Sequence, residues 1–313
     1  MSRNDGFTYG ERLGADAENV ALLAYLCRRY RHSSPSAWRR RIESGDVRVD
    51  SAEVRPEEPL RRGQRLEWRR PPWDEPDAPL GFERLYEDDD VLVVAKPPGL
   101  PTLPGANFLQ STLLHQVRRE VAAAAPLHRL GRWTSGVVLF AKTAAARAEL
   151  SRQLRAREIG KRYRALASGC PAWDTLTVDA PIGRVPHPML GSVHAAAADG
   201  KPSTSRVEVL ARRASAFLCD VRIATGRPHQ IRIHLAAAGH PLVGDPLYPA
   251  GGIPAPDARA LPGDPGYRLH AAEIAFRHPG NGRAVVVSAT PPPDLRRVDA
   301  PDATLSAHVE ADA

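Results

Sequence analysis

The sequence predicts an α+β fold in which helices and antiparallel strands share one domain. Continuous apolar runs of strand length occur at 91–95 and 137–141, and polar residues flank each run, as is typical of strands buried on both faces. Residues 207–209 alternate apolar and charged side chains and are followed by a further strand pattern at 217–224, which favours antiparallel pairing. A helix predicted at 144–157 lies between these strands, so helices and strands share one domain.

The N-terminal part of the chain predicts two helices and a small hairpin. Residues 18–30 space their apolar side chains as a helix does. Ser34 is placed to cap a second helix, which ends at Gly45. Short strands follow at 47–49 and 65–68. These elements indicate a small separate domain.

A change in composition separates this part from the rest of the chain. The segment 71–79 reads PPWDEPDAP and is rich in proline and acid, as an extended linker is. We therefore predict a domain at 1–70, a linker at 71–79 and a larger domain at 80–292. The last segment, 293–313, turns polar and acidic and is predicted to be a flexible tail.

Charge and composition favour a nucleic-acid partner. The net charge is +7 and only four of the basic residues are lysines. The arginine guanidinium suits bidentate contact with phosphate and stacking on bases. A GC-rich genome, which favours arginine codons throughout, is an alternative explanation of the arginine excess, so charge alone does not decide.

Other features indicate a cytoplasmic protein. The longest apolar runs are far shorter than the roughly 20 residues of a transmembrane helix, and residues 1–10 lack the apolar core of a signal peptide. Cys27, Cys170 and Cys219 are widely separated and odd in number, which is neither a disulfide framework nor a metal-ligand spacing. We expect a reduced protein that is a monomer and has no membrane partner.

Further elements fit the same fold. A proline-stiffened loop, KPPGLPTLPG, follows the strand at 91–95. Ser111 is placed to cap one helix and Thr143 to cap the helix at 144–157, whose arginines form a basic face typical of a solvated surface. The next strand is predicted at 161–167.

Two long motifs contain most of the candidate functional residues. Residues 128–142 read HRLGRWTSGVVLFAK, so a loop with Arg and Gly precedes a buried strand, where functional loops tend to lie. Residues 225–234 read TGRPHQIRIH. Pro228 fits the first turn of a helix that ends at Gly239. Exposed amides near Arg227 would then form a cationic helix N-terminus suited to a phosphate or a carboxylate.

These motifs resemble those of the RluA-type RNA pseudouridine synthases. The segment 128–142 is similar to the family's HRLDxxTSGLLLxAK, 225–234 to its TGRxHQIRxH and 161–167 to its KxYxAL, in the family's order. The resemblance covers about residues 80–292 and implies a pseudouridine synthase fold, in which a mixed, largely antiparallel sheet carries helices and a central cleft binds RNA. It also implies isomerisation of uridine to pseudouridine in a structured RNA, either rRNA or tRNA, with no cofactor.

The N-terminal domain resembles a degenerate form of the S-four-type (αL) RNA-binding module. Arg39, Arg40 and Arg41 lie on its second predicted helix and are candidates for RNA contact. The alternative is a small basic cap on the larger domain that does not touch RNA.

The resemblance also assigns roles to single residues. Gly131 takes the position of the catalytic aspartate, Tyr163 that of the aromatic ring that stacks on the target uracil, and Arg227 that of the arginine that pairs with the aspartate. The resemblance implies RNA contacts by a further set of residues, which are Arg129, Arg132, Thr134, Lys161, His229, Gln230, Ile231 and Arg232.

Glycine at position 131 leaves the chemistry open. The family reaction requires a carboxylate as nucleophile or base, and glycine has no side chain. One hypothesis is a synthase in which another group acts or in which the HRLG variant still works. A second is an RNA-binding protein that has the fold without the catalysis, and a third is a structural or small-molecule role.

Six histidines raise the question of a metal site. Their spacing includes neither HxxxH nor HExxH, and no cysteine accompanies them, so we predict that no metal is bound. These histidines are His128, His229, His234, His240, His270 and His278.

Overall fold

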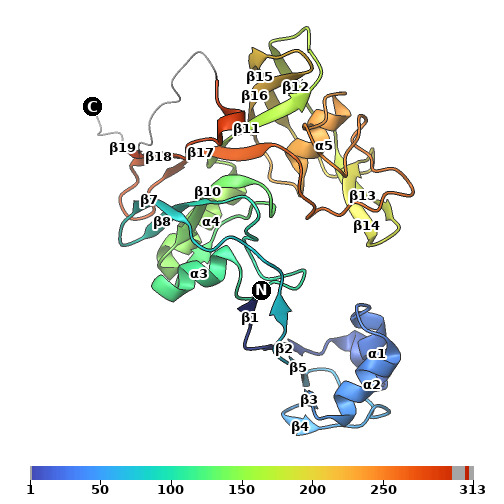
Figure 1. Ribbon diagram of the computed structural model, residues 1–313. Helices are drawn as coiled ribbons and strands as arrows, with labels where there is room; N and C mark the ends of the chain where they lie inside the picture. Colours follow the sequence, from blue (N-terminus) through green and yellow to red (C-terminus); the bar gives the residue numbers. More distant parts are fainter. Residues whose placement is uncertain (1, 298–306, 310–313) are drawn as a thin grey trace. The chain divides into compact units, whose positions relative to one another are not determined.

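The computed structural model describes residues 2–297 and 307–309 (Figure 1). The chain divides into two compact units, Met1–Pro76 and Asp77–Ala313. The division falls inside the proline-rich segment 71–79, and each unit has its own core.

Part of the proline-rich segment is paired rather than extended freely. Strand β6 (Asp74–Glu75) pairs antiparallel with β1 (Ser2–Arg3). The side-chain amide of Asn4 donates a hydrogen bond of 2.8 Å to Glu75, and both residues are buried. The start of the chain and the segment between the two units are therefore held together.

The N-terminal unit consists of two helices and an antiparallel four-stranded sheet. The Oγ of Ser34 accepts a hydrogen bond from the amide of Ala37, which confirms the predicted cap. The sheet has the order β2-β5-β3-β4. The elements are β2 (Phe7–Arg12), a 3-10 turn η1 (Ala15–Ala17), α1 (Leu22–Arg29), α2 (Pro35–Glu43), β3 (Val47–Val49), β4 (Ala52–Glu53) and β5 (Arg65–Arg70).

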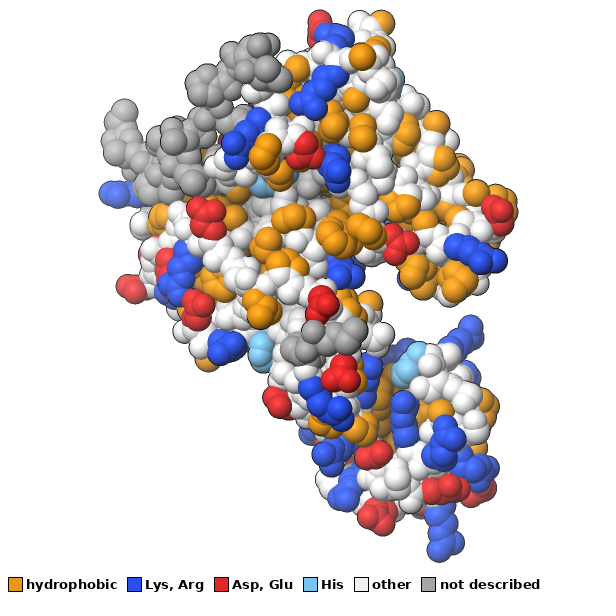
Figure 2. Space-filling model, in the orientation of Figure 1, with side chains coloured by type: hydrophobic (Ala, Val, Ile, Leu, Met, Phe, Trp, Pro, Cys, Tyr) orange, Lys and Arg blue, Asp and Glu red, His pale blue; other side chains and the backbone are white. Residues whose placement is uncertain are grey.

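Two tryptophans form the centre of this unit's core. Trp38 on α2 and Trp68 on β5 are buried, and their ring centroids are 5.3 Å apart in an edge-to-face arrangement. The guanidinium of Arg41 lies 4.8 Å from the Trp38 ring centroid. Arg41 is thus engaged inside the unit by a cation–π contact. Figure 2 shows other Lys and Arg side chains, together with acidic ones, on the visible face of the unit.

The larger unit is built on one eleven-stranded sheet. Eight strands follow the order β12-β15-β16-β11-β17-β10-β8-β7, while β18 pairs with β17, β19 with β18, and β9 with β10. Among the described strands of this sheet, only β10 and β17 pair in parallel, so the sheet is mixed and largely antiparallel, as predicted.

The strands expected at 91–95, 137–141, 161–167, 207–209 and 217–224 overlap β8, β10, β11, β15 and β16, respectively. The strands of this sheet are β7 (Glu83–Glu87), β8 (Val91–Lys96), β9 (Ala125–Pro126), β10 (Ser135–Ala141), β11 (Gly160–Ser168), β12 (Thr175–Val178), β15 (Ser205–Arg212), β16 (Ala216–Ile223), β17 (Leu269–Arg277), β18 (Ala284–Ser288) and β19 (Ala307–Val309).

Side chains of β8 and β10 alternate between two cores. Leu92 and Val138 lie in one apolar cluster, whereas Val93 and Leu139 lie in the other. The first cluster includes residues of α3 (Leu113–Glu120) and α5 (Gln230–Ala237), and the second includes residues of α4 (Ala144–Ala156). The sheet is therefore covered on both faces, which explains why these strands read as continuous apolar runs.

Two helix boundaries differ from the sequence prediction. Helix α3 is capped by Thr112, whose Oγ1 accepts from the amide of His115, so the predicted cap at Ser111 is wrong by one residue. Helix α5 begins at Gln230 after His229, which has a left-handed backbone (φ 56°). Pro228 therefore precedes the helix instead of forming its first turn.

The later part of the chain adds a hairpin and a short terminal pairing. Strands β13 (Ile182–His187) and β14 (Gly191–Ala196) form a two-stranded antiparallel sheet, and Ile182 at the start of β13 also bridges to Lys201. A 3-10 turn, η2 (Pro293–Leu295), follows β18. Of the predicted flexible tail, 298–306 and 310–313 lie outside the described residues, whereas β19 pairs with β18. No helix in the described part is long and apolar enough to cross a membrane.

Candidate active site

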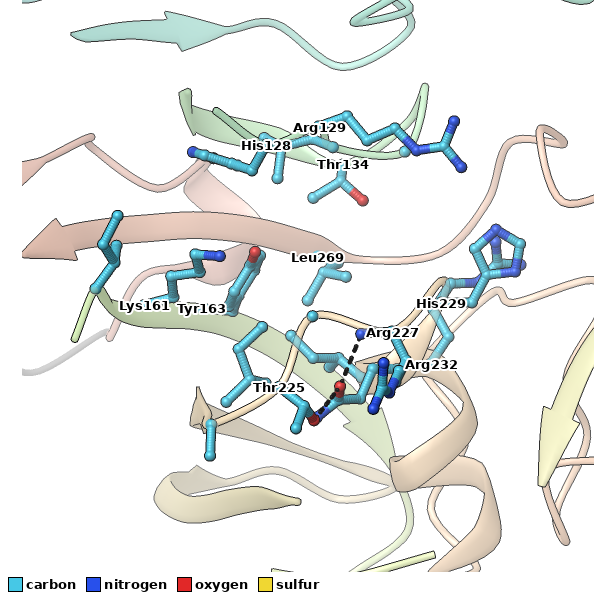
Figure 3. A pocket seen from close by; sticks show the side chains of 18 of the residues that line it. His128, Arg129, Thr134, Lys161, Tyr163, Thr225, Arg227, His229, Arg232 and Leu269 are labelled. Atoms are coloured by element: carbon cyan, nitrogen blue, oxygen red, sulfur yellow. Dashed lines mark hydrogen bonds between the residues drawn. The ribbon is translucent and has the colours of Figure 1, made fainter. Parts of the chain in front are cut away.

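A cavity of about 550 Å³ lies where the two sequence motifs meet (Figure 3). Its walls are the loop before β10, the first residues of β11, and the segment between β16 and α5. The size is that of an ordinary ligand pocket. The residues that line it are Leu127, His128, Arg129, Leu130, Gly131, Thr134, Leu154, Arg155, Arg157, Ile159, Lys161, Tyr163, Ile223, Ala224, Thr225, Gly226, Arg227, His229, Gln230, Ile231, Arg232, Tyr267 and Leu269.

The loop at 128–134 is held in place by hydrogen bonds to Thr102 and by a hydrogen bond within the loop itself. Thr102, in the proline-stiffened loop, accepts from the amide of Leu130 and donates to its carbonyl through the same hydroxyl, at 3.2 and 3.0 Å. The amide of Thr134 donates to the carbonyl of Gly131 at 3.1 Å, which closes a turn. The backbone at Gly131 is thus fixed relative to the sheet.

Lys96 joins the two loops from inside the protein. Its Nζ donates to the carbonyls of Pro97, Leu100 and Arg132 at 2.8, 2.8 and 3.0 Å, and its side chain is buried. Burial lowers the pKa of Lys96 to about 7. The three carbonyl acceptors oppose this shift, because only the protonated amine has three N–H groups to donate. Lys96 is therefore a structural residue of the loop.

Gly136 has a backbone that only glycine accommodates well. Its φ is +105°, and a Cβ there would lie 2.1 Å from the carbonyl oxygen of Ala271 on β17. Gly136 and Ala271 face each other in the parallel pairing of β10 with β17. The glycine thus permits the close approach of these two strands at the end of the 128–134 loop.

Gly131 differs from Gly136 in this respect. It is not among the glycines with positive φ, so its backbone accepts other residues. An added Cβ would lie 2.9 Å from the hydroxyl oxygen of Tyr267 and 3.4 Å from Oγ1 of Thr134. A side chain at position 131 would therefore come closer to the Tyr267 hydroxyl than van der Waals contact allows.

The first residues of β11 form a second wall. Figure 3 shows Lys161 and Tyr163 side by side, across the cavity from the loop of His128 and Thr134. Burial raises the pKa of Tyr163 to about 12, and burial also lowers the pKa of Lys161. Tyr163 is 8% exposed, so one part of the ring belongs to the core and another lines the cavity.

The third wall is the segment at 225–230, whose backbone and side chains are held by hydrogen bonds to the side chain of Gln230. Oε1 of Gln230 accepts from the hydroxyl of Thr225 and from the amide of Arg227, at 2.8 and 3.1 Å. Its Nε2 donates to the carbonyl of Thr204 and to Ser205. The amide of Arg227 is therefore satisfied internally and is not available to a ligand.

Arg227 carries a polar group without a partner. Its Nε is buried and has no hydrogen-bond partner within the described structure. Its Nη2 donates a long hydrogen bond of 3.4 Å to the carbonyl of Pro202. An unsatisfied buried donor costs free energy, which an acceptor on a bound ligand would recover.

Arg232 is fully engaged inside the protein. Nε and Nη2 donate to the two carboxylate oxygens of Asp245 at 2.7 and 2.8 Å, and the side chains are 3% and 0% exposed. Burial alone would lower the pKa of Arg232, but the hydrogen bonds and charge of Asp245 outweigh it and raise the pKa. The guanidinium also lies 4.1 Å from the ring centroid of Tyr267.

The histidines of the site are neutral. Burial, with a smaller contribution from the charge of Lys161, lowers the pKa of His128 to about 3. Burial, followed by the charge of Arg232, lowers the pKa of His229 to about 3 as well. Nε2 of His128 accepts from the amide of Leu139 at 3.2 Å, a role that needs the neutral ring. Within the described residues no cluster of His, Cys, Asp and Glu could hold a metal ion.

The cavity gathers most of the residues that the sequence singled out. Gly131, Tyr163 and Arg227 line it, as do Arg129, Thr134, Lys161, His229, Gln230, Ile231 and Arg232. Arg132 does not. Its Nε donates to the carbonyl of Gly99, Nη2 donates to that of Asp77, and the guanidinium lies 4.6 Å from the ring centroid of Phe108. Arg132 therefore braces the proline-stiffened loop.

Several lining residues were not singled out from the sequence. Arg155 and Arg157 belong to the basic face of α4, which the sequence did not distinguish from ordinary surface. Tyr267 precedes β17 in a loop without a recognisable motif and comes to Gly131 only through the parallel pairing of β10 and β17. None of the described lining residues is Asp or Glu, so the cavity is strongly cationic.

Comparison with known proteins gives one family. The sequence model of the family described as RNA pseudouridylate synthase matches residues 90–237. An uncharacterised RNA pseudouridine synthase of Synechocystis sp. is 42% identical over 276 residues, covering 88% of this chain and 95% of that protein. RNA pseudouridine synthase 5 of Arabidopsis thaliana is 37% identical over 347 residues, covering 93% and 94%. The solved structure of human RNA Pseudouridylate Synthase Domain Containing 1 aligns with a TM-score of 0.54 and 26% identity, covering 77% of this chain and 94% of that one. The chain belongs to the RluA-type RNA pseudouridine synthase family.

Proposed function

We propose that this protein binds a structured RNA, either rRNA or tRNA, takes one uridine into the cavity and isomerises it to pseudouridine. The observation that carries the proposal is the unpartnered Nε of Arg227 in a cationic cavity that also contains the ring of Tyr163. A phosphate or uracil oxygen would supply the missing acceptor, and the ring would hold an unstacked base.

The walls of the cavity suit the parts of a nucleotide. Arg129, Arg155 and Arg157 provide charge for the RNA backbone, since phosphate contacts position the RNA. Tyr163 provides a flat face for the base, and a stacked base contributes roughly 1–3 kcal/mol to binding. The absence of carboxylates from the described lining avoids repulsion of phosphate.

The reaction moves one bond and, in net terms, one hydrogen. The bond between C1′ and N1 of uridine breaks, uracil turns, and a bond between C1′ and C5 forms. N1 gains a hydrogen and C5 loses one, so the reaction needs no oxidant. A group that approaches the sugar must stabilise C1′ while uracil is detached.

A second candidate function is RNA binding without catalysis. It is favoured by one observation, that glycine stands at 131 and that the described lining contains neither Asp nor Glu. Both functions predict the same RNA contacts, and only the first predicts a change in the RNA.

Mapping of pseudouridine in cellular RNA tests the proposal. RNA from cells that lack the gene is compared with RNA from cells complemented with the wild type or with Arg227→Gln. We expect at least one uridine that is isomerised in the presence of the wild type, is unmodified without the gene, and is poorly modified with the variant. Identical maps with and without the gene, together with retained binding of the RNA, would instead support the second function.

A further inference from the structure

The hydroxyl of Tyr267 stands at the position that a side chain on residue 131 would take. Its oxygen is 2.9 Å from the place of a Cβ on Gly131. In an aspartate, each carboxylate oxygen is about 2.4 Å from its own Cβ, as bond lengths and angles require. The phenolic oxygen is thus about as far from that Cβ position as the oxygens of an aspartate would be.

Tyr267 is held firmly in this position. Its side chain is 4% exposed, and its hydroxyl is 3.4 Å from Oγ1 of Thr134. The guanidinium of Arg232, locked by Asp245, lies 4.1 Å from the ring centroid. A negative charge that develops on the phenolate is shared with the ring and would therefore lie near a fixed cation, which favours the transition state.

We propose that Tyr267 is the catalytic residue of this chain, with its phenolic oxygen in the role that a carboxylate at 131 would have. This inference rests on the proposed function. Tyrosine can act as the covalent group in other glycosyl-transfer enzymes. Tyr267 also lines the same cavity as Tyr163 and Arg227, the two residues that we propose hold the nucleotide.

The step balances in atoms and electrons. The oxygen of Tyr267 bonds C1′ as the C1′–N1 bond breaks, and the hydroxyl proton passes to N1 of the departing uracil. After uracil turns, C5 bonds C1′ and the bond from C1′ to the tyrosine oxygen breaks. The hydrogen on C5 leaves as a proton and restores the hydroxyl.

Lys161 is the competing group in the cavity. Burial lowers its pKa, and an amine can act as a nucleophile or a base. It lies beside Tyr163 on β11 (Figure 3), whereas Tyr267 adjoins the position of the missing side chain itself. The geometry therefore favours Tyr267.

The proposal has a steric consequence for position 131. An aspartate there is compatible with the backbone, because φ is not positive, but its Cβ would collide with the Tyr267 hydroxyl. Gly131→Asp alone is expected to displace Tyr267 and to gain little. Gly131→Asp combined with Tyr267→Phe removes the colliding oxygen and places a carboxylate in the same space.

The test measures tritium released from RNA labelled at C5 of uridine, together with RNA affinity and the midpoint of unfolding. Tyr267→Phe keeps the ring against Arg232 and removes only the hydroxyl. We expect its rate to fall at least about 100-fold, with affinity and midpoint close to the wild type. Tyr86→Phe is the matched control, because its hydroxyl donates to Asp88 and neither residue belongs to the described cavity lining. It should keep the wild-type rate.

The outcomes separate this inference from the proposed function. A wild type that binds RNA but releases no tritium overturns both. An active wild type with an equally active Tyr267→Phe variant overturns the role of Tyr267 and leaves the function standing. If the variant with both Gly131→Asp and Tyr267→Phe releases tritium faster than Tyr267→Phe alone, the carboxylate and the phenol act at the same position. If this double variant folds and binds RNA but is no faster than Tyr267→Phe, the shared position is contradicted.

Discussion

Arg227 and Arg232 lie five residues apart in one motif but differ in how many of their guanidinium N–H groups have a hydrogen-bond acceptor. Arg232 is 2% exposed and meets a carboxylate that is itself buried, through two hydrogen bonds. Arg227 is half-buried, and within the described structure its Nε has no acceptor. Asp245 therefore pairs with Arg232, whereas no carboxylate among the described residues pairs with Arg227.

The difference separates a structural arginine from one that is available to a ligand. A buried guanidinium with a bidentate partner positions its surroundings, here Tyr267 and the loop of Asp245. A guanidinium without a partner in a cavity has its hydrogen-bonding capacity left for a substrate. The two arginines should respond differently to mutation.

Asp245→Asn should have the largest effect of the variants discussed, and the effect should be a loss in the free energy of unfolding. Removing the charge leaves Arg232 buried and unpaired, which typically costs about 3–5 kcal/mol. The carboxylate also accepts from the amides of Leu247 and Tyr248. Urea unfolding measures the change, and Asp174→Asn, whose side chain is 84% exposed in its pair with Arg212, is the control and should change little. A loss below about 1 kcal/mol would contradict the structural role of the pair.

Arg227→Gln should show the opposite behaviour. Stability should stay near that of the wild type, whereas RNA affinity should fall by about 1.5–3 kcal/mol, the size of a charge-assisted hydrogen bond. The slope of log affinity against log salt should become shallower by about 0.7–0.9 if a phosphate is the partner. Arg222→Gln removes an exposed arginine that pairs with Glu208 outside the described cavity lining and serves as control. Equal losses in both variants would show that only net charge matters.

Tyr163→Leu should weaken binding selectively. Leucine keeps apolar volume in a ring position that is only 8% exposed, but it offers no flat face to a base. Affinity for RNA with an unpaired uridine should fall by roughly 1–3 kcal/mol. Binding to plain duplex RNA should hardly change. Equal losses on the two RNAs would indicate a packing role for Tyr163.

The pH dependence of stability should report the neutral histidines. The pKa of His128 and of His229 is about 3 in the folded protein and about 6.5 when unfolded, so the unfolded chain binds more protons between these values. The free energy of unfolding should therefore fall as the pH drops below about 6.5, by up to about 1.4 kcal/mol per pH unit for each histidine.

His128→Gln isolates one of these contributions. Glutamine can accept the hydrogen bond from the amide of Leu139 without titrating. Urea unfolding between pH 7 and pH 5 should then show a slope reduced by about 1.4 kcal/mol per pH unit at most. An unchanged slope would mean that His128 is not buried as a neutral ring.

The fold was predictable where local pattern and burial agree. Strands β8 and β10 are buried on both faces and read as apolar runs, and Thr143 caps α4 as its position predicts. Helix α5 was misplaced at its start because the side chain of Gln230, not a turn of helix, satisfies the amide of Arg227. Such a side-chain bond leaves no periodic signal.

The site was predictable only where a motif contains the residue. Tyr163 and Arg227 were singled out as candidates by their motifs, and both line the cavity. Tyr267 was not, because its position depends on the pairing of β17 with β10 and on the absence of a side chain at Gly131. Arg132 looked equivalent to Arg129 in the sequence, but its guanidinium contacts Phe108 and it does not line the cavity.

The most direct test of the account is a multiple-turnover assay of the purified wild type. RNA with tritium at C5 of uridine is supplied in excess over the protein, since formation of the bond between C1′ and C5 releases that hydrogen. The account predicts released tritium well beyond one equivalent of protein, from a cavity whose described lining has no carboxylate. RNA that is bound in the cavity but releases no tritium would contradict it.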